Sequence, residues 1–61
     1  MTQATENEIR MFHRSADVLR AAMEAGDVAT VREMIDEIEV ISLHTDSAEV
    51  RQMCQPYMLP N

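Results

Sequence analysis

The sequence predicts an all-helical fold in which an antiparallel helical hairpin is followed by a short third helix. Apolar residues recur at intervals of three and four along most of the chain, which is the spacing of one face of an α-helix. A Gly-Asp pair at residues 26–27 separates two such periodic segments and is typical of a tight turn between antiparallel helices. Pro56 marks the end of the helical pattern, because proline has no backbone N–H and clashes with the preceding turn.

The first helix is expected over residues 5–25. Thr5 and Glu8 have the spacing of a capping box at its start. Gly26 is expected to end this helix in the left-handed conformation, and Asp27 to cap the next one. The apolar residues expected to face the core are Ile9, Phe12, Ala16, Leu19 and Met23.

The second helix is expected over residues 28–44, and it is apolar on two sides near its end. Val40 and Leu43 project away from its core line, among acidic residues. Because a hairpin covers only one of these sides, we expect the third segment to cover the other. The core line consists of Val31, Ile35, Ile38 and Ser42, widened by Val28, Met34 and Ile41.

A short third helix is expected over residues 47–55, capped by Thr45 or Asp46. Its inward residues are predicted to be Val50, Met53 and Cys54. The apolar tail, residues 56–61, is expected to fold back over the hairpin, with docking on a partner as the alternative.

All 61 residues are expected to form one domain. A chain of this size buries only about 60% of its unfolded surface, so its core is marginal when alone. The lone cysteine, Cys54, excludes an internal disulfide. We therefore expect a monomer that a partner stabilises, or a compact homodimer. With no export signal in the first residues and only short apolar stretches, a cytoplasmic location is expected.

The charge is strongly and unevenly negative. Eleven acidic residues stand against five arginines, for a formal net charge of −6. Residues 27–61 hold seven of these acids and only two of the arginines. Such a charge repels phosphate backbones and anionic membranes, so we expect no direct binding to nucleic acid or membrane. It favours a protein partner with a basic surface.

Residue types that support catalysis are too scattered to predict an enzyme. His13, His44 and Cys54 fall on three separate elements, without the converging spacing of metal ligands. The single glycine cannot form a phosphate-binding loop. We therefore expect no catalytic residue, no metal site and no cofactor.

Two surfaces are candidates for partner binding. The first is an acidic face after Gly26, which alternatively serves only to keep the chain soluble. The second is an apolar seam, whose methionine suits an adaptable contact. The acidic candidates are Glu33, Asp36, Glu37, Glu39, Asp46 and Glu49. The seam candidates are Met11, Val18, Val40 and Leu43.

Residues 21–35, AAMEAGDVATVREMI, resemble the helix–Gly-Asp–helix core of an ankyrin repeat. The chain has neither the flanking turn signature nor a second copy, so we interpret this resemblance as shared hairpin chemistry. In size and hairpin plan the chain also resembles plasmid copy-control proteins of the RNA-binding four-helix-bundle type. Their nucleic-acid face is basic where this one is acidic, so their activity does not carry over.

The function expected from charge and size is that of a phage or mobile-element inhibitor, similar to anti-CRISPR proteins. Its carboxylates would imitate nucleic acid and block a basic, nucleic-acid-binding surface of a host protein. One alternative is a helical co-chaperone or adaptor that holds a partner helix on the apolar seam. The other is a dimerisation module of a transcriptional regulator.

Overall fold

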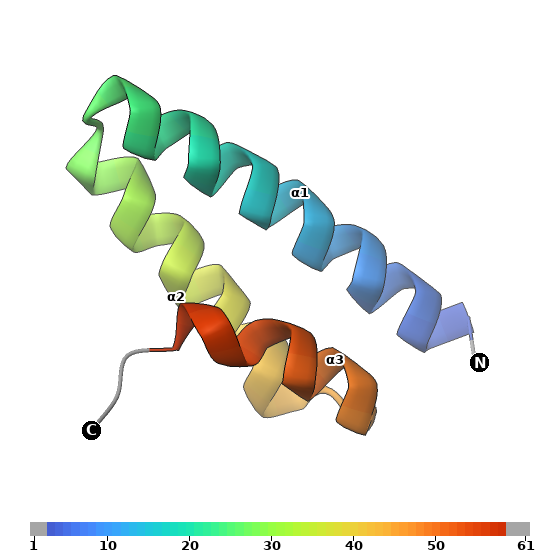
Figure 1. Ribbon diagram of the computed structural model, residues 1–61. Coiled ribbons are helices and arrows are strands. Elements are labelled where there is room, and N and C mark those ends of the chain that lie inside the picture. Colours follow the sequence, from blue (N-terminus) through green and yellow to red (C-terminus); the bar gives the residue numbers. More distant parts are fainter. Residues whose placement is uncertain (1–2, 59–61) are drawn as a thin grey trace.

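The computed structural model describes residues 3–58, and this part of the chain is helical almost throughout. It contains α1 (Gln3–Ala25), α2 (Val28–His44), α3 (Ala48–Cys54) and one turn of 3-10 helix, η1 (Gln55–Tyr57). Figure 1 shows α1 and α2 side by side and opposite in direction, with α3 across the end of α2 that is distant from their connection. The predicted all-helical fold class is confirmed for the described residues.

The connection between α1 and α2 follows from two residues, Gly26 and Asp27, which we call the joint. Gly26 has φ 71°, a left-handed conformation that residues with a Cβ rarely adopt. The Asp27 carboxylate accepts hydrogen bonds from the Thr30 backbone N–H at 3.2 Å and from its hydroxyl at 2.6 Å. The sequence-based predictions for both joint residues are therefore confirmed.

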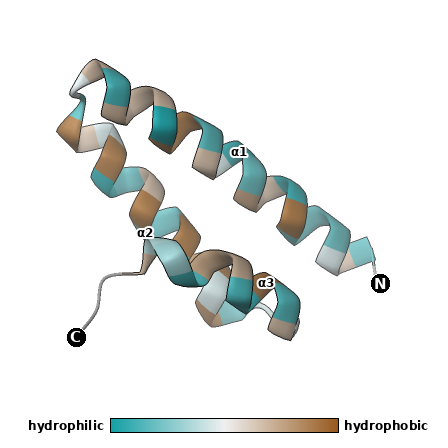
Figure 2. Cartoon of the chain, in the orientation of Figure 1, coloured by the Kyte–Doolittle hydropathy of each residue, from teal (hydrophilic) through white to brown (hydrophobic). Residues whose placement is uncertain are grey.

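The core lies where all three helices meet. Ile38 of α2 and Val50 and Cys54 of α3 have no exposed surface. Apolar bands recur between polar ones along α1 and α2 (Figure 2), and the buried apolar residues lie three or four positions apart, so each helix faces this core with one apolar stripe. The buried residues that α1 contributes to it are Phe12, Ala16 and Leu19.

The start of the tail folds back on the core. The Tyr57 ring meets the Phe12 ring edge-on, with centroids 5.6 Å apart. Fold-back is thus confirmed for this first part of the tail, while residues 59–61 lie outside the described part of the chain. Pro56 falls within η1, after the α-helical conformation has ended at Cys54.

The core is shorter than the sequence predicted. Met23 and Val28 were expected to be inward, but they are 65% and 63% exposed. Both lie beside the joint, whereas α3 packs at the opposite end of α2. At about 1.5 Å per residue, the seven residues of α3 extend about 10 Å and cannot reach them.

Two predicted caps are wrong. α1 is already helical at Gln3, so Thr5 lies within the helix instead of capping it. Ser47, not Thr45 or Asp46, caps α3, because the Ser47 side chain accepts a hydrogen bond from the Val50 N–H at 3.3 Å.

Thr45 instead holds the three helices together. Its hydroxyl donates to the Glu8 carboxylate of α1 at 2.8 Å and accepts the Ser47 backbone N–H at 3.1 Å. Its backbone carbonyl accepts a hydrogen bond from the Arg51 guanidinium of α3 at 3.0 Å. Glu8 is therefore engaged in a tertiary contact, and not in a capping box.

The expected cover over the second apolar side of α2 is also absent from the described structure. Val40 and Leu43 are 52% and 70% exposed, on the side that the helical spacing predicted. α3 packs against the Ile38 side of α2 instead, because its own apolar residues Val50 and Cys54 meet Ile38 there.

Candidate interhelical binding site

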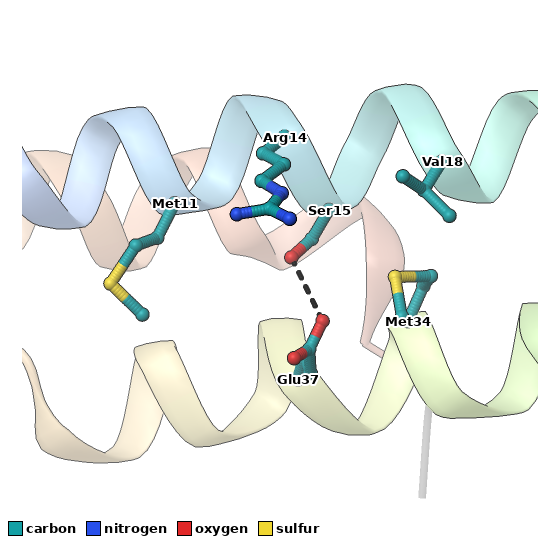
Figure 3. Close-up of a pocket in the computed structure, with 6 residues that line it drawn as sticks. All are labelled: Met11, Arg14, Ser15, Val18, Met34 and Glu37. Atoms are coloured by element: carbon teal, nitrogen blue, oxygen red, sulfur yellow. Dashed lines mark hydrogen bonds between the residues drawn. The ribbon is translucent and has the colours of Figure 1, made fainter.

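A hollow lies between α1 and α2, and α3 passes behind it in the view of Figure 3. It has two adjoining parts of about 320 Å³ and about 360 Å³. Met11, Ser15 and Glu37 line both parts, so we treat them as one site, the interhelical hollow. The other lining residues are Arg14, Val18, Glu33, Met34, Asp36, Val40 and Ile41.

The α1 wall of the hollow comprises four residues at helical spacing. Met11, Arg14, Ser15 and Val18 follow one another at intervals of three, one and three, so they share one face of α1. Met11 is 56% exposed, whereas Ser15 is only 6% exposed. Half of this wall is apolar, namely Met11 and Val18, and Arg14 is its one charged residue.

The α2 wall repeats the same spacing with different chemistry. Glu33, Asp36, Glu37 and Val40 share one face of α2. Three of these four residues carry carboxylates. This side of the hollow is therefore acidic, and Met34 and Ile41 of α2 add apolar surface beside the carboxylates.

One hydrogen bond crosses the hollow. The Ser15 hydroxyl donates to Oε2 of Glu37 at 3.3 Å (Figure 3), which is longer than the usual O–H···O distance of about 2.5–3.0 Å and marks a weak bond. The Glu37 carboxylate thus reaches toward α1 across the hollow, although Glu37 remains exposed. Met11 and Met34 extend into the same space from opposite helices.

The structure brings together three of the six predicted acidic residues, namely Glu33, Asp36 and Glu37. Glu39 is exposed but lies two residues beyond Glu37, about 200° around the helix, and so points away from the hollow. Asp46 is exposed in the connection between α2 and α3, and Glu49 is exposed in the first turn of α3.

Three of the four predicted seam residues also line the hollow. Met11 and Val18 lie on its α1 wall and Val40 on its α2 wall. Leu43, the most exposed of the four, does not line either part. The two candidate surfaces, treated separately in the sequence, therefore meet at one site.

Sequence reasoning did not identify Arg14 and Ser15 as site residues. They lie three and four positions after Met11, which was predicted, so the same helical spacing would have found them. Met34 was expected beside the core line of the second helix, and the structure shows it half-buried at the edge of the hollow.

The residues with chemical reactivity lie elsewhere. His13 is exposed beside the Phe12 ring, and His44 is exposed at the end of α2. Cys54 is buried, and burial together with the negative charge of Glu8 raises the pKa of its thiol. Across residues 3–58, no three His, Cys, Asp or Glu side chains lie together as metal ligands would.

The electrostatic character of the hollow suits a cationic ligand. Three carboxylates and one guanidinium line it, alongside exposed methionine and valine side chains. Such a surface can pair with ammonium or guanidinium groups while also covering apolar area.

Within residues 3–58, no helix has both the length and the apolar character to cross a bilayer. Comparisons with protein-family models, curated proteins and solved structures give no match.

Proposed function

We propose that this protein is a non-enzymatic binding protein whose interhelical hollow engages a positively charged surface of another protein. One observation supports the proposal above the others. Glu33, Asp36 and Glu37 share a single hollow with exposed apolar side chains, in a chain of net charge −6. An acidic residue that serves only solubility has no need of such neighbours.

The first proposed role of this protein is that of an inhibitor of the phage or mobile-element type, comparable to anti-CRISPR proteins. The carboxylates occupy positions that phosphates of a nucleic acid would take on the partner, and so block its basic binding surface. The negative charge that disfavours direct nucleic-acid binding is the property that this role requires.

A second form is a helical adaptor or co-chaperone that holds a partner segment mainly through apolar contact. The presence of Met11, Val18 and Val40 in the same hollow favours it. Salt separates the two forms, because exposed charges are screened beyond about 8 Å at physiological ionic strength. The inhibitor should lose affinity steeply as salt rises and yield to competing nucleic acid, whereas the adaptor should do neither.

The test compares two variants of equal charge. The hollow variant carries Glu33→Gln, Asp36→Asn and Glu37→Gln. The control variant carries Glu39→Gln, Asp46→Asn and Glu49→Gln, which neutralises the three acidic candidates that do not line the hollow. A partner is first captured from extracts of the native host, identified and purified, and its dissociation constant is then measured for each protein.

We expect the hollow variant to bind about tenfold more weakly than the parent chain, since exposed ion pairs contribute roughly 0.2–1 kcal/mol each. The control variant should bind within about twofold of the parent. Equal weakening in both variants would mean that net charge alone matters. Unchanged affinity in the hollow variant would remove the basis of the proposal.

A further inference from the structure

We infer that the occupant of the interhelical hollow is a basic amphipathic α-helix of the partner, lying lengthwise between α1 and α2. This inference rests on the proposed function, because it names the element of the partner that the same site receives. Four features of the hollow lead to it: the spacing of its walls, its apolar side chains, the asymmetry of its charges and the weakness of the bond across it.

The wall spacing matches a helical ligand. Met11–Val18 and Glu33–Val40 each span seven residue steps, about 10.5 Å or two helical turns. A helix that docks in a groove uses anchors at i, i+3 or i+4, and i+7, which extend over the same length. An extended strand instead repeats its side chains about every 7 Å on one face. This repeat does not match the helical turn of about 5.4 Å at which the side chains of both walls recur.

The apolar side chains supply sites for such anchors. Met11 reaches in from α1 and Met34 from α2 (Figure 3), and Val18 lies two helical turns after Met11 on the α1 wall. Methionine is unbranched and flexible, so it adapts to the shape of an inserted side chain. Leucine or isoleucine residues on one face of the partner helix would displace water from this surface.

The charges of the hollow determine which flank of the partner helix must be basic. The three carboxylates all belong to α2, whereas Arg14 is the charged residue of the α1 wall. The partner must therefore carry lysine or arginine on the flank that faces α2. Glu33 and Glu37 are one turn apart, so two basic residues at an i, i+4 spacing would meet both.

The same charges disfavour a second copy of this chain as the occupant. Two hollows placed face to face would enclose six carboxylates and two arginines. Removing unpaired charges from water is costly, and four of these carboxylates would have no arginine to pair with. A basic helix neutralises the α2 wall instead.

The bond across the hollow is easily exchanged. Ser15 and Glu37 are joined at 3.3 Å, between a neutral donor and a carboxylate. A guanidinium or ammonium group forms a shorter and stronger bond to the same carboxylate. Entry of the partner helix would therefore replace the Ser15 contact of Glu37 with a stronger one.

The experiment uses a labelled peptide of about 15 residues, a length at which a single helix begins to be stable in water. Leucines occupy one face, and arginines occupy one flank at i and i+4. A second peptide has the same composition in an order that destroys the amphipathic face, and a third has proline at its centre. Binding to the full chain is followed by fluorescence anisotropy.

We expect the amphipathic peptide to bind at least about tenfold more tightly than either control peptide, a difference of about 1.4 kcal/mol. Met11→Glu should abolish this preference. Met23→Glu is the matched control, because Met23 is also an exposed methionine of α1 but does not line the hollow. It should leave the preference intact.

Equal binding of all three peptides would overturn the helical occupant. The proposed function would survive that result if the hollow variant still lost its purified partner. Selective peptide binding together with an unchanged partner affinity in the hollow variant would instead defeat the proposed function. A dimer of the parent chain by light scattering, which Met11→Glu dissociates, would identify a second copy as the occupant and overturn the inference.

Discussion

The two faces of the α1–α2 pair are built from the same helices but differ in their cover. On one face, Phe12 and Ile38 are buried beneath α3, at 6% and 0% exposure. On the other face, Met11 and Val40 remain more than half exposed around the interhelical hollow. The difference teaches that helical spacing assigns a residue to a side, whereas burial depends on what lies over that side.

Truncating one residue on each face should have very different effects on stability. Ile38→Ala should destabilise the protein by about 2–5 kcal/mol, because it leaves a cavity in a fully enclosed site. Val40→Ala should change the free energy of unfolding by less than about 0.5 kcal/mol, as an exposed substitution does. Urea denaturation followed by circular dichroism measures both values. A comparable loss in Val40→Ala would show that the open face is covered in solution.

The buried polar residues of the two faces offer a second test. Thr45 makes hydrogen bonds at 2.8 and 3.1 Å through its hydroxyl, so Thr45→Val should cost about 1–3 kcal/mol and leave Glu8 without this donor. Ser15→Ala removes one long bond whose acceptor, Glu37, is exposed, and should cost less than about 1 kcal/mol. Thermal unfolding of both variants compares them. Equal losses would mean that the hollow is as dry as the core.

The smallest expected effect is at alkaline pH. Burial raises the pKa of the Cys54 thiol above its ordinary value of 9.0, so the folded chain keeps this proton to higher pH than the unfolded chain. The contribution of this thiol to the free energy of unfolding should therefore be fully present below about pH 9. It should be lost as the pH rises through the folded-state pKa, so that stability falls slightly. Urea midpoints measured across this range should show the loss in the parent chain.

The matched variant moves the thiol to the open face, through Cys54→Ala combined with Val18→Cys. At position 18 the side chain is 39% exposed, so a thiol there should ionise similarly in the folded and unfolded states. The thiol-dependent loss should then vanish. An identical alkaline slope in both proteins would assign it to another group.

Local sequence signals predicted the helices and the joint. Gly26 and Asp27 act through their own backbone and nearest turn, so their roles follow from residue type and position alone. The exposure of Met23 and Val28 was not predictable in this way. It depends on how far α3 extends over α2, and no periodicity within α1 or α2 encodes that distance.

Tertiary contacts explain the remaining differences. By residue type and position, Thr45 was a reasonable cap for α3. In the structure its hydroxyl instead donates to Glu8, which lies 37 positions earlier in the chain. Likewise, the spacing of Met11 and Val18 defined a seam on α1, and that of Glu33 and Asp36 a face on α2. Only the alignment of the two helices brings these sets to one hollow.

The Glu8–Thr45 hydrogen bond has a consequence for the order of folding. Its two residues are far apart along the chain, so loop-closure entropy opposes their meeting until α1 and α2 have aligned from the joint outward. α3 depends on that alignment, because Arg51 binds the same Thr45. We expect α3 to form last when the chain folds and to detach first when it unfolds, ahead of the two long helices.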